Sequence, residues 1–143
     1  MFIGEYQHNL DAKGRIIVPV KLREELGVKM IVTAGLDKNL LIYTTEQFEE
    51  IASQLMKLPK TNARARQYVA HTLGKASECE VDAQGRILIP APLVEAAQLK
   101  KNCVIVGQYD HVQLWDKELW ENYYEDASSK IDDIAESLTE FLV

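Results

Sequence analysis

Two short stretches of this sequence, DAKGR and DAQGR, combine residue types that could bind an anionic partner. They are residues 11–15 and 82–86. The arginine that ends each copy carries a rigid fork of donors, which matches a phosphate group or the O6 and N7 atoms of guanine. Arg15 and Arg86 each follow a predicted turn, and turns lie at protein surfaces. The two copies therefore predict two exposed contact residues for nucleic acid.

The other residues of each copy are typical of a type I turn. Aspartate at the first position can accept hydrogen bonds from the backbone of the turn, and glycine at the fourth position tolerates the geometry of the exit. We therefore expect Asp11 and Gly14, like Asp82 and Gly85, to shape the turns rather than to contact a partner.

The surroundings of the two arginines differ in charge. Lys13 occupies the third position of the first turn, and Gln84 occupies that position in the second; both side chains can donate to a phosphate or a base edge. Lys21 and Arg23 follow the first copy, whereas the uncharged segment APLV follows the second. The comparison predicts that the basic surface is centred on the first turn.

Two other interpretations of the repeated stretch stay open. The aspartate and arginine of each copy could form ion pairs that only stabilise the hairpin. Alternatively, Asp11 and Asp82 could approach each other about an internal twofold axis and share a proton, as the carboxyls of aspartic proteases do. The turn D-A-x-G has one residue more than the D-[ST]-G turn of those enzymes and lacks its hydroxyl group, so the second interpretation is the weaker.

Signals for other chemistries are missing from the sequence. There is no phosphate-binding loop, nucleophile elbow or zinc-protease motif. Cys79 and Cys103 lie in strand-like contexts, and the three histidines are scattered. We predict two buried thiols, no metal, no cofactor, no small-molecule substrate and no enzyme. No apolar run is long enough to span a membrane, and no signal segment opens the chain, so we expect a cytoplasmic protein.

The acidic composition does not exclude a nucleic-acid partner. The formal net charge is −6, but residues 116–143 contain nine acidic residues and only two lysines. The acidity is therefore a property of the C-terminal segment. The remaining surface is nearly neutral overall and can present a local basic face.

The repeat extends well beyond the two turns. At an offset of 71 residues, Asp11, Ala12, Gly14, Arg15, Ile16, Pro19, Leu22 and Glu24 recur as Asp82, Ala83, Gly85, Arg86, Ile87, Pro90, Leu93 and Glu95. After a slip of one residue, 32–49 lies over 104–121, which places Gly35 on Gly107, Tyr43 on Trp115 and Phe48 on Trp120. Each half is therefore the same supersecondary unit.

Each unit has the same predicted order of elements. The strands are expected around 5–10, 15–19, 30–35 and 40–44, and again around 76–81, 86–90, 103–108 and 112–116. A short helix is expected after the second strand, at 21–27 and 91–99. Further helices are expected over 45–58, with Thr44 and Gln47 at capping-box spacing, over 60–72 with Asn62 as N-cap, and in one long helix after Asp116 with an apolar stripe from Trp120 to Leu138.

Halves of this size are small for independent stability. We therefore expect an α+β, mainly β fold, in which the two halves pack about a pseudo-twofold axis and bring both DAxGR turns to one surface. The predicted division is a first repeat (1–58), a helical linker (59–73), a second repeat (74–126) and a C-terminal helical extension (127–143).

The sequence resembles the MraZ family over about residues 1–126. The resemblance rests on MFIGEYQHNLDAKGRIIVP, SECEVDAQGRILIP, IYTTEQFE and LWDKELWE. It implies two fused AbrB-like repeats that form one double-split β-barrel with flanking helices. It also implies that the D-x-x-x-R motif, here Asp11/Arg15 and Asp82/Arg86, contacts DNA.

The same resemblance implies a biological role. Family members are bacterial transcription regulators, typically repressors, that form ring-shaped homo-oligomers. They bind direct repeats in the promoter of the cell-division and cell-wall gene cluster, so the implied location is the cytoplasm and nucleoid. The expected DNA-binding residues are then Arg15 and Arg86, together with Lys13, Gln84, Lys21 and Arg23. An alternative is a ring-forming scaffold in which the arginines make contacts between subunits.

Overall fold

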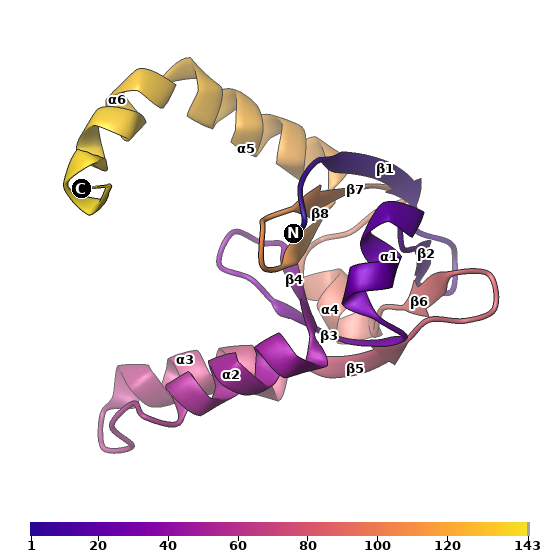
Figure 1. The fold of residues 1–143 in the computed structure, drawn as a ribbon, viewed down its shortest axis with the longest axis horizontal. Helices are drawn as coiled ribbons and strands as arrows, with labels where there is room; N and C mark the ends of the chain where they lie inside the picture. Colours follow the sequence, from indigo (N-terminus) through magenta and orange to yellow (C-terminus); the bar gives the residue numbers. More distant parts are fainter. Residues whose placement is uncertain (143) are drawn as a thin grey trace.

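Figure 1 shows the computed structural model, which describes residues 1–142. The first half contains β1 (Glu5–Asn9), β2 (Arg15–Ile17), α1 (Val20–Leu26), β3 (Lys29–Ala34), β4 (Leu40–Thr44) and α2 (Thr45–Leu55), and α3 (Ala63–Gly74) leads to the second half. The second half contains β5 (Ser77–Glu80), β6 (Arg86–Leu88), α4 (Ala91–Ala96), β7 (Asn102–Gly107), β8 (Val112–Asp116), α5 (Lys117–Ser129), α6 (Ile131–Ser137) and a final 3₁₀ turn, Thr139–Phe141.

The strands of the two halves are interleaved in one sheet. Six antiparallel strands run in the order β1-β7-β8-β4-β3-β5, and β2 pairs with β6 in a separate two-stranded ribbon. The first strand of each half therefore pairs with the third strand of the other half. Neither half has a complete sheet of its own. The division into repeat, linker, repeat and extension thus stays a prediction about organisation.

Two strand pairs locate a pseudo-twofold axis. In the ribbon Ile16 lies opposite Ile87, and in the sheet Leu41 lies opposite Gln113. Each of these residues faces its own counterpart in the sequence repeat. A residue can face its counterpart in this way only at an axis of symmetry, so the axis passes through both pairs.

The α+β class is confirmed, with its strands in antiparallel sheets, but closure into a barrel is not shown. Within residues 1–142 the edge strands β1 and β5 do not pair with each other, and the ribbon does not pair with the sheet. The core lies between one face of the six-stranded sheet and a layer made of the ribbon, α1 and α4. It contains Ile16, Ile87, Leu22, Leu93 and the buried thiols Cys79 and Cys103.

The helices that close the two halves dock in equivalent ways. The rings of Tyr43 and Phe48 lie 6.0 Å apart, and those of Trp115 and Trp120 lie 5.3 Å apart. The predicted N-caps are also confirmed. The side chains of Thr44, Asn62 and Asp116 accept hydrogen bonds from the backbone N–H groups of Gln47, Ala65 and Leu119.

Three sequence predictions need correction. Helix α2 ends at Leu55 rather than at residue 58, because the N–H groups of Lys57 and Leu58 bond to carbonyls three residues back instead of four. The expected long C-terminal helix is two helices, because Lys130 has φ −134° and ψ 29°, outside the helical region. Val32 pairs with Ile42, and Ile105 pairs with Leu114, the counterpart of Ile42, so Val32 corresponds to Ile105 and not to Val104, where the sequence comparison placed it.

Two helical projections leave the body of the molecule in Figure 1. Helices α2 and α3 lie side by side as a helical hairpin, and α5 with α6 forms a separate C-terminal arm. Both extend away from the side that carries the β2–β6 ribbon. Among the described residues, no helix combines the length and apolar character required to cross a bilayer.

Candidate nucleic-acid interface

The side chain of Asp11 organises the first turn. Its Oδ1 atom accepts hydrogen bonds from the backbone N–H groups of Lys13 and Arg15, both at 2.9 Å. Its Oδ2 atom accepts a bond from Arg15 Nε at 2.7 Å. One carboxylate therefore both closes the turn and orients the guanidinium that follows it.

The second turn repeats this arrangement. Asp82 accepts hydrogen bonds from the backbone N–H groups of Gln84 and Arg86, and from Arg86 Nε, all at 2.9 Å. Asp82 therefore bonds the backbone of its own turn in the same way as Asp11 does. The ion pairs that the sequence left as an alternative also form. Because they use Nε, they fix the direction of each arginine rather than occupy its whole guanidinium.

Both aspartates stay ionised at neutral pH. Hydrogen bonds from the backbone N–H groups of Arg15 and Lys13, together with the Arg15 side chain, lower the pKa of Asp11; Arg86 and Gln84 lower the pKa of Asp82 in the same way. A shared-proton dyad would instead raise the pKa of one carboxyl group. The geometry therefore gives no support to the aspartic-protease interpretation.

Glycine is required in both turns. Gly14 has φ +85° and Gly85 has φ +80°, in a region that L side chains rarely adopt. A Cβ atom on Gly14 would also lie 3.0 Å from the carbonyl oxygen of Ile89. The turns are held by the opposite half of the chain: Ile89 N–H donates to the Gly14 carbonyl, and Val18 N–H donates to the Gly85 carbonyl.

The ribbon brings the two arginines onto one face. Side chains alternate along a strand, so the buried pair Ile16 and Ile87 leaves Arg15, Ile17, Arg86 and Leu88 on the outer face. Nη1 of Arg86 lies 4.0 Å from Oδ2 of Asp11, which links the second copy to the first. The expectation that both turns share one surface is confirmed. The repeated motif did not predict Ile17 and Leu88 on this face, although their two-residue spacing from each arginine could have indicated them.

The two arginines differ in how fully they are bound within the chain. Arg86 bonds Asp82 through Nε and Gln84 Oε1 through Nη2 at 3.1 Å. Arg15 bonds Asp11 through Nε, and its Nη1 and Nη2 atoms make no hydrogen bond within residues 1–142. The terminal nitrogens of the first arginine are therefore better placed to bind a partner.

The position of Arg23 corrects the expected grouping of basic residues. Its guanidinium donates to the Val18 carbonyl, at 2.9 Å from Nη2, and lies directly over Gly85 in the second turn. A Cβ atom on Gly85 would be only 2.3 Å from Arg23 Nη2. Helix α1 of the first half thus packs beside the turn of the second half. The basic residues are shared between both turns rather than gathered around the first.

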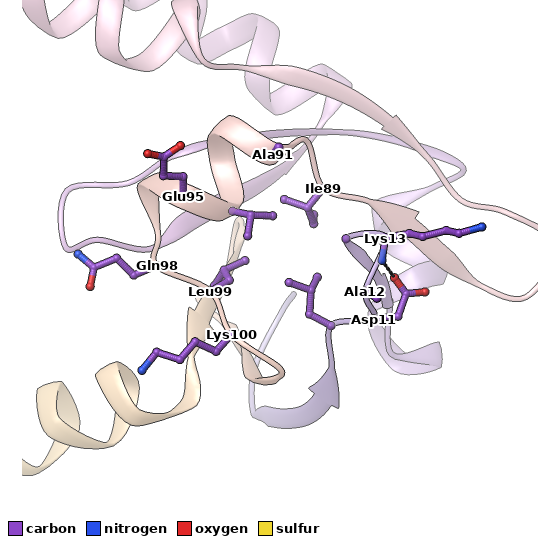
Figure 2. Close-up of a pocket in the computed structure, with 12 residues that line it drawn as sticks. Asp11, Ala12, Lys13, Ile89, Ala91, Glu95, Gln98, Leu99 and Lys100 are labelled. Carbon is purple, nitrogen blue, oxygen red and sulfur yellow. Dashed lines mark hydrogen bonds between the residues drawn. The ribbon is translucent and has the colours of Figure 1, made fainter.

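The other candidate residues are exposed near the ribbon. Lys13 and Gln84 are exposed at the tips of their turns, and Lys21 is exposed on α1. Figure 2 shows an open groove between the first turn and α4, with a volume of about 580 Å³. The Lys13 side chain extends away from this groove, whereas Glu95, Gln98 and Lys100 stand around its other side. The Lys13 ammonium group is therefore directed to solvent beside the ribbon.

Comparison with known proteins gives a consistent relationship across the whole chain. A family model described as "MraZ protein, putative antitoxin-like" matches it twice, over residues 1–70 and 72–142. A protein of Carboxydothermus hydrogenoformans is 46% identical over 100% of both chains. Proteins of Ligilactobacillus salivarius and Thermoanaerobacter sp. are each 45% identical, over 99% and 96% of both chains. All three relatives are named "Transcriptional regulator MraZ". Two matches in tandem and such identity over the full length establish that this chain belongs to the MraZ family.

Proposed function

We propose that this chain regulates transcription by binding double-stranded DNA with the outer face of the β2–β6 ribbon. The observation that carries the proposal is the pair of half-buried arginines, each oriented by an aspartate through Nε, on the outer face of the ribbon. Held through Nε, Arg15 keeps both terminal nitrogens available for a base edge or a phosphate, whereas Arg86 also uses Nη2 to bond Gln84. The names of the relatives support the same role.

The residues around the ribbon have separate roles in this proposal. Arg15 and Arg86 reach base edges, and Gln84 supports Arg86 or donates to a base itself. Lys13 and Lys21 contact phosphates because their charged ends are exposed at the rim. Arg23 binds DNA through the part of its guanidinium that does not bond the Val18 carbonyl. The turn-shaping residues set the positions of all these groups without touching DNA.

Only a few basic groups per chain face the DNA, so useful affinity requires several chains acting together. The two helical projections offer complementary surfaces for such an assembly. Residues 51–77 contain five lysine or arginine residues and no acidic residue, whereas the C-terminal segment is strongly acidic. A groove of about 270 Å³ between α2 and α3 is lined by Leu55, Met56, Leu58, Val69 and neighbouring residues. The C-terminal arm exposes Tyr124, Ile131, Leu138 and Phe141.

In the proposed assembly, the C-terminal arm of one chain docks on the helical hairpin of the next chain. This contact joins two different surfaces, so repeating it gives a ring when the rotation between neighbouring chains closes. Successive subunits then present the same ribbon in the same direction, which suits direct repeats in DNA. The AbrB-like barrel, the role as a repressor, the nucleoid location and the promoter of the division and cell-wall genes belong to this proposal through the family resemblance.

DNA binding is tested by fluorescence anisotropy over a series of salt concentrations. The probe is the DNA upstream of the gene that encodes this chain, with a scrambled duplex as competitor. Arg15→Ala should weaken specific binding by about 1–3 kcal/mol per engaged site, and Lys13→Ala should weaken binding to both duplexes and reduce the salt slope. Lys38→Gln is the matched control, because Lys38 lies on the β3–β4 loop, away from the ribbon (Figure 1). Unchanged affinity in the Arg15 and Arg86 variants would refute the role of the ribbon.

Light scattering separates the regulator from the scaffold alternative. If the arginines bind DNA, their alanine variants keep the native mass and lose DNA affinity. If they join subunits, the mass falls in those variants. The arm-to-hairpin contact is tested by reversing charge in Arg64→Glu/Arg66→Glu, which should dissociate the assembly. Asp132→Lys/Asp133→Lys in a second chain should restore it in the mixture. A native mass in both charge-reversal variants would refute this contact.

A further inference from the structure

Two exposed aliphatic side chains occupy the same face of the ribbon as the two arginines. Ile17 is 40% exposed and Leu88 is 56% exposed. Leu88 lies directly opposite Arg15, and Ile17 lies directly opposite Arg86. Side chains in such facing positions are neighbours, about 4.5–5.5 Å apart at Cβ. The outer face is therefore one four-residue patch in which guanidinium and aliphatic groups alternate, which we call the ribbon patch.

The fold itself does not require aliphatic residues at these two positions. The inner face of the ribbon is already filled by Ile16 and Ile87, each 1% exposed, which supply the contact with the core. Leu88 leans toward the first turn, since its Cδ1 atom lies 3.8 Å from the Cβ position of Gly14. An exposed apolar pair between two oriented cations points to a partner with both anionic and apolar features.

The major groove of DNA has both features. It is about 12 Å wide and admits a two-stranded ribbon, whose strands lie about 4.8 Å apart. Its floor presents guanine acceptors to arginine and the C5-methyl group of thymine to apolar side chains. The geometry of the patch therefore matches a groove floor on which guanine acceptors and thymine methyl groups alternate.

We propose that Ile17 and Leu88 are specificity-determining residues that contact thymine methyl groups, while the arginines beside them bind guanine. This inference rests on the proposed DNA-binding function and adds a chemical class to its target: thymine-containing steps next to guanine. Cytosine or uracil at these positions lacks the methyl group, so the aliphatic side chain loses that contact and binding is weaker. The aliphatic pair thus adds sequence information that phosphate contacts cannot supply.

The test uses two forms of the upstream DNA, one amplified with dTTP and the other with dUTP. Uracil pairs like thymine but lacks the methyl group. Wild-type protein should bind the uracil form more weakly, by about fourfold for each methyl group engaged, as expected for loss of one buried carbon. Ile17→Ala and Leu88→Ala should each bind the thymine form more weakly and discriminate less between the two forms. The double variant should bind both forms equally.

Leu36→Ala is the matched control, because Leu36 is 75% exposed on the β3–β4 loop. It should keep the full difference between the two DNA forms. Circular dichroism and light scattering confirm that each variant is folded and keeps the native mass. If wild-type protein prefers the upstream DNA over a scrambled duplex but binds the thymine and uracil forms equally, the inference is overturned while the proposed function stands. If wild-type protein shows no preference for the upstream DNA, the proposed function itself is refuted. A fall in mass in the Ile17 or Leu88 variant would instead assign the aliphatic pair to contacts between copies.

Discussion

The packing of Arg23 over Gly85 predicts a specific energetic coupling between two residues that lie far apart in the sequence. In Gly85→Ala, the backbone keeps φ near +80° and the new Cβ atom would lie 2.3 Å from Arg23 Nη2. The positive φ costs about 1–2 kcal/mol for an L residue. Moving the guanidinium also breaks its bond to the Val18 carbonyl, which contributes about 1 kcal/mol. Gly85→Ala should therefore lower the free energy of unfolding by about 2–3 kcal/mol.

Arg23→Ala alone should remove only the bond to the Val18 carbonyl, at a cost of about 1 kcal/mol. In the double variant that bond is lost once, and the Cβ atom of residue 85 meets no guanidinium. The double variant should therefore be about 1 kcal/mol more stable than the sum of the two single effects implies. Urea unfolding at one fixed protein concentration measures this coupling, since self-association would make the stability depend on concentration.

Gly14→Ala provides the control for this cycle. Its Cβ atom would meet the Ile89 carbonyl, at 3.0 Å, and not an arginine. Gly14→Ala and Arg23→Ala should therefore be additive within about 0.5 kcal/mol. Additivity between Gly85→Ala and Arg23→Ala as well would show that α1 does not cover the second turn, and the assignment of Arg23 to that turn would be wrong.

Three further predictions concern the arginines, the aspartates and a buried thiol. Arg15→Ala should weaken DNA binding more than Arg86→Ala in anisotropy titrations, because the Arg86 guanidinium is also held by the side chain at the tip of its own turn; a larger loss in Arg86→Ala would contradict this. The lowered pKa of Asp11 and Asp82 means that their contribution to stability is fully present above the unfolded pKa of about 4 and is lost as pH falls through the folded pKa. Unfolding of wild type and of the Asp11→Asn/Asp82→Asn variant should thus differ at pH 6 and converge at low pH; a difference that persists would refute it. Burial raises the pKa of Cys103 to about 11, so a thiol reagent at pH 8 should modify it only after unfolding, and rapid labelling of the native protein would contradict its burial.

Much of the local structure followed from short-range sequence signals. The D-A-x-G turn forms as expected because the aspartate and the N–H groups it binds are at most four residues apart. The N-caps at Thr44, Asn62 and Asp116 formed for the same reason. Each of these features depends on contacts within one turn of the chain, and the sequence contains both partners side by side.

Predictions failed where helix ends or long-range partners decided the outcome. The interruption at Lys130 lies in a segment whose apolar spacing continues without a break, so periodicity gave no sign of it. The one-residue shift in the correspondence of β3 with β7 could be recognised only from the strands that pair with them. Assigning Arg23 to the first turn failed because proximity in sequence was taken for proximity in space.

The sequence by itself determined that the chain contains one supersecondary unit twice, that each copy ends a turn with an arginine, and that it belongs with the MraZ family. Only the tertiary structure decided which helix covers which turn, and that Ile17 and Leu88 share a face with the arginines. The physical reason is that β1 pairs with β7 and β5 pairs with β3. This exchange buries one common core that neither half can complete alone. Because of this exchange of strands, α1 packs beside the second turn and β2 pairs with β6. The surface that faces a partner is therefore composed of both repeats.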